Sequence, residues 1–151
     1  MSIKIVATNR KARHQYQFHD AFEAGMVLVG SEIKSIRAGR VSLQDGYVQF
    51  EEGEAWLVNV HIAPYDPANR QNHEPRRRRK LLLHRREIDR LRGRVQERGY
   101  TVVPTKIYLK DGRAKVEIAL ARGKKQYDKR QTLAQRDSKR QMERAVKERY
   151  Q

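Results

Sequence analysis

Residues 104–123 read PTKIYLKDGRAKVEIALARG, and this stretch carries the clearest evidence on the fold. Apolar and polar side chains alternate on both sides of Asp111-Gly112, a pattern typical of two antiparallel strands joined by a two-residue turn. We therefore predict a β-hairpin here. Its apolar faces are Thr105, Ile107 and Leu109 before the turn and Ala114, Val116, Ile118 and Leu120 after it.

A second hairpin is predicted from residues 47–50 and 55–62, which flank the turn sequence EEGE. In the second of these runs, alternate residues are apolar, and period-two spacing places them on one face of a strand. The predicted inward residues are Trp56, Val58, Val60 and Ile62.

The preceding segment predicts one strand and one short helix. Residues 16–29 favour a strand that is bent or bulged at Gly25. Ser31 is expected to cap a helix that ends at Gly39, because serine accepts from free amides and glycine tolerates the left-handed conformation. Lys34 and Arg37 would lie on the outer face of this helix.

A second helix is predicted from Arg85 to Arg98, with an apolar stripe and with Gly99 just beyond its end. Short antiparallel strands with two or three helices predict a mainly β fold. We expect a small oligonucleotide-binding-like antiparallel β-barrel, closed or nearly closed, over residues 1–122, and a basic C-terminal tail over residues 123–151.

The charge of the chain points to a polyanionic partner. It has 34 Lys and Arg against 18 Asp and Glu, a net charge of +16. Such a charge attracts nucleic acid, because binding releases counterions condensed on the phosphates. The last thirty residues hold eleven Lys or Arg and four Asp or Glu with few large apolar side chains, so this tail cannot order itself. We predict RNA as the partner; a basic protein that is merely soluble is the alternative.

Other features bear on location and chemistry. The chain has no cysteine, no apolar run of the ~20 residues that a membrane span needs, and no apolar leader at its start. These features predict a cytoplasmic protein without a membrane partner. The five histidines lack metal-ligand spacing, and no carboxylate pair stands out, so we expect neither an enzyme nor a cofactor. A ribonuclease using His14, His61 or His84 with a lysine is the alternative.

Two clusters are candidate RNA contacts. The run Arg76, Arg77, Arg78, Arg79 and Lys80 repels itself unless a polyanion or solvent screens it, which favours phosphate contact. A solvated charge run or an import signal is the alternative. The second cluster combines phosphate donors, a base-edge reader and stacking rings, and it comprises Asn9, Arg10, Lys11, His14 and Tyr16.

Six strings in order resemble the small protein B family, the SsrA-binding proteins of bacteria. They are NRKARHQY at 9–16, FEAG at 22–25, GSEIKSIRAG at 30–39, RKLLLH at 79–84, PTKIYLKDGRAKVEIALARGKK at 104–125 and YDKR at 127–130. The resemblance implies a barrel that binds the tRNA-like domain of transfer-messenger RNA (tmRNA). It also implies entry into stalled ribosomes with elongation factor Tu, where the protein replaces the missing codon–anticodon part of a tRNA. A structural ribosomal protein or another rRNA-binding protein is the alternative.

The resemblance also implies which residues contact RNA. The tmRNA-binding residues would be Asn9, Tyr16, Glu23, Leu82 and His84, supported by Arg10, Lys11, Lys34, Arg37 and Lys80. His84 stands where some members carry Asn, and it would be either an RNA contact or a helix cap.

The tail is expected to act on the small ribosomal subunit and its rRNA. The residues implied at the decoding site are Lys124, Lys125, Tyr127, Asp128, Lys129 and Arg130; some members carry His in place of Tyr127. Farther along, spacing by four would align an apolar stripe if the tail became helical in the empty mRNA channel. That stripe is Met142, Val146 and Tyr150, with Arg144 and Lys147 available for rRNA phosphates.

Overall fold

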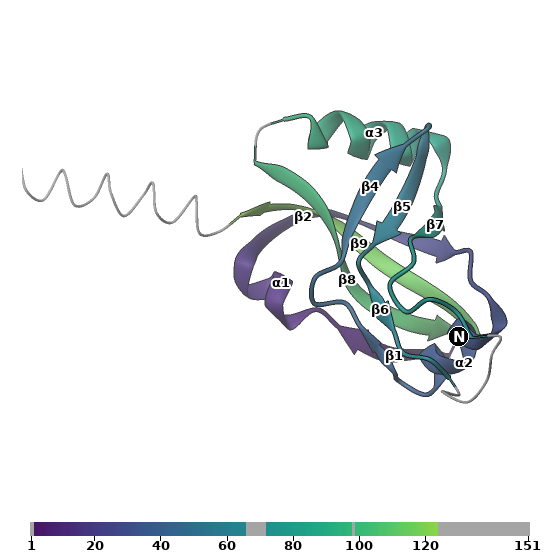
Figure 1. Ribbon diagram of the computed structural model, residues 1–151. Helices are drawn as coiled ribbons and strands as arrows, with labels where there is room; N and C mark the ends of the chain where they lie inside the picture. Colours follow the sequence, from purple (N-terminus) through teal and green to yellow (C-terminus); the bar gives the residue numbers. More distant parts are fainter. Residues whose placement is uncertain (1, 66–71, 98, 124–151) are drawn as a thin grey trace, which may run out of the picture.

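The computed structural model describes residues 2–65, 72–97 and 99–123. Its main feature is a seven-stranded antiparallel sheet in the order β1-β8-β9-β2-β7-β5-β4, with β3-β6 as a small second sheet (Figure 1). The strands are β1 Ile3–Thr8, β2 Tyr16–Met26, β3 Val41–Ser42, β4 Tyr47–Glu51, β5 Glu54–Val58, β6 His61–Ile62, β7 Arg79–Leu82, β8 Tyr100–Lys110 and β9 Arg113–Gly123. The helices are α1 Arg10–Gln15, α2 Gly30–Arg37 and α3 Arg85–Val95.

The hairpin predicted around Asp111-Gly112 is present as β8 and β9. Both turn residues have positive φ, 50° for Asp111 and 80° for Gly112, and Lys110 pairs with Arg113. Two left-handed residues make a turn whose twist matches that of the strands, which explains why Asp-Gly is favoured here. The predicted inward face is confirmed: Ile107, Val116, Ile118 and Leu120 have no exposed surface.

The hairpin of β4 and β5 is also present, but its predicted inward face was partly wrong. Ala55 and Leu57 are the fully buried residues of β5, whereas Trp56 lies on the outer face. Val60 and Ile62 are nevertheless buried as predicted. Asn59 explains the difference, because its positive φ of 61° ends the strand and shifts the alternation by one residue.

The strand β2 is regular where a bend was expected. Gly25 pairs with Leu82 of β7 and with Lys115 of β9, and the register shift lies instead between Phe18 and Ala21. The strand ends at Met26, before Val29. Gly25 therefore keeps its place in the strand pairing, and its lack of a side chain leaves space beside Leu82.

The helix α2 begins differently from the prediction. Val29 is the N-cap residue, and its backbone amide donates to Glu32 Oε1 at 2.9 Å. Ser31 lies inside the helix, with its hydroxyl 2.8 Å from Nδ1 of His73. Gly39 follows the helix with a φ of 76°, as expected.

The helix α3 is shorter than predicted, because it ends at Val95 with Gln96 as the C-cap residue. Ile88 and Leu91 are buried as expected. Gly99 has the left-handed conformation expected of it, with a φ of 90°. It does not directly follow the helix, however, because α3 already ends at Val95.

The expected closed barrel does not form among the described residues. β1 and β4 are the two edges of the sheet and do not pair with each other. β8 is paired with β1 on one side and β9 on the other, so β4 packs against β8 without entering its ladder. The sheet curves around the main core, to which α2 adds Ile36 and α3 adds Ile88, and a second small cluster includes Ala12 of α1. Within the described ranges, no helix has the length and apolar character needed to cross a membrane.

Candidate RNA-binding surface

The predicted RNA-binding residues fall into separate regions of the surface. Tyr16 begins β2 and Gly25 is the residue before its last, Met26. Nine steps of about 3.3 Å separate Tyr16 and Gly25 by roughly 30 Å along the strand. α1 lies at the first end and α2 at the second (Figure 1). The sequence cluster at 9–16 therefore does not share a site with Leu82 and Arg37.

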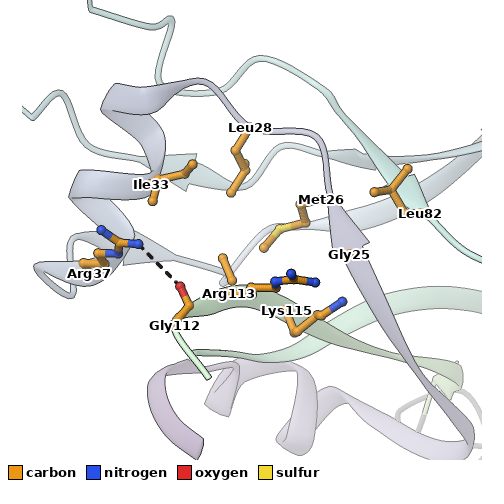
Figure 2. A pocket seen from close by; sticks show the side chains of 10 residues that line it. Gly25, Met26, Leu28, Ile33, Arg37, Leu82, Gly112, Arg113 and Lys115 are labelled. Atoms are coloured by element: carbon orange, nitrogen blue, oxygen red, sulfur yellow. Dashed lines mark hydrogen bonds between the residues drawn. The ribbon is translucent and has the colours of Figure 1, made fainter. Parts of the chain in front are cut away.

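A groove of about 410 Å³ lies between α2, the strands β2 and β7, and the β8–β9 turn (Figure 2). We call it the α2 groove. Its apolar lining comes from Met26, Leu28, Ile33, Leu82 and Ala114, and its cationic lining from Arg37, Arg113 and Lys115, with Gly25 and Gly112 completing it. Two predicted RNA contacts, Leu82 and Arg37, meet here.

Strand pairing places Leu82 on this groove. Its pairing with Gly25 sets the leucine side chain on the outer face of the sheet, where 55% of its surface is exposed. A Cβ atom at Gly25 would lie 3.4 Å from the Leu82 Cβ atom. The absence of a side chain at Gly25 therefore keeps the groove open beside an exposed leucine.

The cations of the α2 groove have no carboxylate partner among the residues that the structure describes. Arg37 Nη2 donates to the carbonyl oxygen of Gly112 at 3.5 Å, which joins α2 to the hairpin turn (Figure 2). Within the described part of the chain, neither Arg113 nor Lys115 forms an ion pair, and no acidic residue lines the groove. The groove is therefore suited to a phosphate.

Glu23 lies two residues before Gly25 on the same outer face of β2. Its Oε1 accepts from the Tyr108 hydroxyl at 2.5 Å, and Lys110 Nζ lies 3.5 Å away. The Tyr108 hydrogen bond lowers the pKa of Glu23 against an opposing effect of desolvation, and Lys110 and Lys115 lower it further. Burial and the same hydrogen bond raise the pKa of the Tyr108 phenol. Glu23 is therefore an ionised, oriented acceptor, able to bind a base amino group or a 2′-hydroxyl.

The arginine run 76–80 is largely held by carboxylates, contrary to its predicted role. Arg79 is fully buried, with Nε 2.6 Å from Glu32 Oε2 and Nη1 2.6 Å from the Val60 carbonyl oxygen. Arg77 Nη2 lies 2.5 Å from Glu32 Oε1. Arg79 cannot reach a phosphate from this position, so its predicted RNA contact is corrected to a structural role.

The exposed members of the run differ from one another. Arg78 forms an ion pair with Glu51, and its guanidinium lies 4.0 Å from the centre of the Trp56 ring. Lys80 Nζ lies 3.9 Å from Glu54. The Arg76 guanidinium donates to Asn59 Oδ1 at 2.8 Å and, among the described residues, has no carboxylate partner, whereas the Arg76 backbone amide donates to Glu74 Oε1 at 3.0 Å.

The first end of β2 gives Asn9 a structural role. Only 1% of Asn9 is exposed. Its Oδ1 accepts from the Ala12 amide at 3.1 Å and caps α1, while Nδ2 donates to the carbonyl oxygens of Leu43 and Pro104 at 3.1 and 2.8 Å. These bonds use both amide hydrogens of a buried side chain, so the predicted RNA contact of the Asn9 side chain is also corrected to a structural role.

The other residues at this end remain accessible. Tyr16 is half-buried against the cluster that contains Ala12 and Val103, and it lines a pocket beside α1. Arg10, Lys11 and His14 are exposed, and Lys11 Nζ lies 2.9 Å from Asp45.

His84 and Lys34 lie at the borders of the second end. His84 is the N-cap residue of α3, but its side chain makes no capping bond; its backbone amide donates to Glu87 Oε1 at 3.1 Å. The exposed imidazole is therefore free of the capping role that was one alternative. Lys34 is exposed on α2, with its ammonium 5.4 Å from the centre of the Tyr65 ring.

Sequence reasoning missed Arg113 and Lys115 as site residues. Both alternate with the inward face of β9, so the hairpin pattern already placed them outward. What the pattern could not provide was their neighbour across the sheet, because Lys115 meets Gly25 only through the pairing of β9 with β2. The predicted decoding-site and tail residues, 124–150, lie outside the described residues.

Known proteins match this chain over nearly all its length. The model of the SmpB protein family matches residues 6–148. The chain is 60% identical over 147 residues to the SsrA-binding protein of Roseiflexus castenholzii, covering 97% of this chain and 93% of that one. It is 57% identical over 146 residues to the SsrA-binding protein of Shouchella clausii, covering 97% and 94%.

The fold has a matching solved structure, described as "tmRNA-SmpB: a journey to the center of the bacterial ribosome". The TM-score is 0.68 at 50% sequence identity, over 78% of this chain and 83% of that chain. The family model, the relatives and the shared fold agree, and the chain belongs to the SmpB family.

Proposed function

We propose that this protein binds tmRNA through its tRNA-like domain and acts in trans-translation on stalled ribosomes. The relatives are named for binding SsrA RNA, and the solved structure concerns tmRNA and SmpB in the ribosome. The net charge of +16 agrees with a partner made of RNA.

One observation supports this function best: Leu82, Arg37 and Glu23, which are far apart in the sequence, gather at the α2 end of β2. An exposed leucine, cations that form no ion pair with the described residues, and an oriented carboxylate together offer apolar contact with a base, phosphate contact and a base-edge acceptor. Structured RNA is recognised by this mixture of contacts at its unpaired nucleotides.

The curved sheet acts as an oligonucleotide-binding-like platform, without catalysis, in the cytoplasm. Elongation factor Tu accompanies the complex with aminoacylated tmRNA. Residues 124–130 occupy the decoding site and residues 131–151 become helical in the empty mRNA channel, so that a channel filled by mRNA leaves the tail no place to order.

Identifying the RNA that copurifies with the full chain from its native cell tests this function. We expect tmRNA to be enriched, and to be lost from a Leu82→Asp and Glu23→Lys double variant that still folds. The competing function is a structural ribosomal protein. A protein that stays on every small subunit through a high-salt wash, without tmRNA enrichment, would establish that alternative.

Deletion of residues 126–151 tests the division of labour. Binding to the tRNA-like domain should remain nearly intact, because the α2 groove lies at the opposite end of β2 from Gly123, which pairs with Tyr16. Peptide tagging on stalled ribosomes should be abolished. Equal loss of both activities would contradict separate binding and decoding parts.

A further inference from the structure

We propose that the α2 groove holds a single unstacked nucleotide of the bound RNA. The base lies against the apolar lining residues, which we call the floor, and the phosphates lie on Arg37, Arg113 and Lys115, which we call the rim. This inference rests on the proposed function and adds to it a subsite of defined chemistry. It also assigns roles to Gly25, Arg113 and Lys115, which sequence reasoning did not single out as RNA contacts.

The apolar floor favours a ligand with a flat, weakly hydrated surface. Met26, Leu28 and Ile33 lie around the same opening as Leu82, which is 55% exposed (Figure 2). Covering an exposed large apolar side chain removes apolar surface from water, and this lowers the free energy when a partner binds. A nucleobase offers a π-face of this kind, and stacking is tolerant of base identity.

The rim determines the charge of the occupant. Arg37 is fixed toward the hairpin by its contact with Gly112, and Arg113 is the exposed residue immediately after that turn. Lys115 lies across from Gly25, on the other side of the floor. These cations, without ion pairs among the described residues, contrast with Arg77, Arg78 and Arg79, which carboxylates already neutralise. Phosphates on both sides of a bound base complement this arrangement.

The volume of the α2 groove suits one nucleotide and is too small for an RNA double helix. The volume of about 410 Å³ falls in the range of ~300–1,000 Å³ of pockets that take single small ligands. Gly25 keeps this space open, and its backbone has an ordinary φ, so a larger residue there would fill the groove without backbone strain. Glu23, beside the groove, can accept from the amino group or the 2′-hydroxyl of the adjacent nucleotide.

The test uses the full chain and transcripts of the tRNA-like domain that carry 2-aminopurine at each unpaired position in turn. The fluorescence of 2-aminopurine rises when the base leaves its stack. We expect one position to brighten on binding. Gly25→Val should remove that change and weaken binding by roughly tenfold, because the added side chain fills the groove and the base loses its contact with the apolar residues there.

A matched control is available on the same strand. Ala21 lies on the outer face four residues before Gly25, so Ala21→Val places the same valine side chain on this strand outside the groove. This variant should bind and brighten as the unmodified protein does. An abasic nucleotide at the brightening position should cost as much as Gly25→Val, and the two changes together should cost no more than either alone.

Arg113→Gln provides a variant that does not depend on filling the groove. The residue is exposed beside the turn, so folding is preserved. The slope of log affinity against log salt should fall by about 0.7–0.9, the value of one phosphate contact. Arg86→Gln on α3, also exposed, should leave the slope unchanged.

The outcomes separate the subsite from the function. Tight binding of the tRNA-like domain with no brightening, and with Gly25→Val equal to Ala21→Val, overturns the subsite and leaves the function standing. Binding no tighter than to an unrelated RNA overturns the function itself. Displacement of the reporter base by a micromolar acidic peptide would reassign the groove to that ligand and also overturn the subsite.

Discussion

Arg79 Nε donates to Glu32 Oε2 at 2.6 Å, and neither side chain has exposed surface. This pair joins β7 to the first turn of α2, so it positions the helix that forms one wall of the α2 groove. Arg79 also donates to the carbonyl oxygens of Val60 and Pro75. A residue expected to bind phosphate is instead part of the scaffold behind the binding surface.

Arg79→Met is expected to lower the free energy of unfolding by about 3–5 kcal/mol, because removing one partner leaves the Glu32 charge buried. Denaturant titration followed by circular dichroism measures this loss. Arg86→Met, an exposed residue of α3, is the matched control and should change stability by less than ~0.5 kcal/mol. Equal effects of the two variants would show that the buried ion pair contributes no more to stability than an exposed arginine does.

The pH dependence of stability should report on Glu32. Burial raises the pKa of Glu32, but hydrogen bonds from Arg77, the Val29 amide and Arg79 outweigh it and lower the pKa below its ordinary value. A lowered pKa in the folded state contributes stability above the unfolded pKa of about 4.3 and loses it as pH falls through the folded value. Unfolding titrations from pH 7 to pH 3 should show this loss, and Glu32→Gln should have a shallower acid slope. Parallel slopes for the two proteins would contradict it.

Tyr108→Phe tests whether the phenol positions Glu23. Loss of the 2.5 Å hydrogen bond should weaken binding to the tRNA-like domain by about three- to tenfold while the fold is retained. The pKa of Glu23 should rise toward its ordinary value, because that hydrogen bond is the largest influence lowering it. Nuclear magnetic resonance titration of the Glu23 carboxyl measures the second effect. Tyr65→Phe is the control, and an unchanged Glu23 titration in Tyr108→Phe would refute positioning.

Asn9→Ala should behave as a stability variant. It removes the cap of α1 and both bonds that the Asn9 amide donates, to the carbonyl oxygens of Pro104 and of Leu43, the second of which keeps the Gly46 amide as a donor. We therefore expect a loss of about 2–4 kcal/mol in the free energy of unfolding. The affinity of the folded fraction for the tRNA-like domain should be unchanged. Thermal unfolding together with RNA titration at low temperature separates the two effects, and lost affinity in a fully folded variant would return Asn9 to the RNA-binding residues.

The sequence predicted the local elements of the fold well. Asp111-Gly112 and Glu52-Gly53 specify turns through the left-handed conformation that glycine tolerates, and this preference needs no tertiary contact. The face of β5 was mispredicted because Asn59 breaks the alternation. Barrel closure was mispredicted because both sides of β8 are occupied, which depends on the order of strands.

The sequence by itself determined the charge of the protein, its hairpins and its amphipathic helices, since these follow from short-range preferences and composition. Only the tertiary structure decided which cations are available. Arg77, Arg78 and Arg79 meet carboxylates from distant segments, whereas Arg113 and Lys115 form no ion pair within the described ranges of the chain. The physical reason is that an ion pair depends on strand register and helix packing, which bring together residues that the sequence keeps far apart.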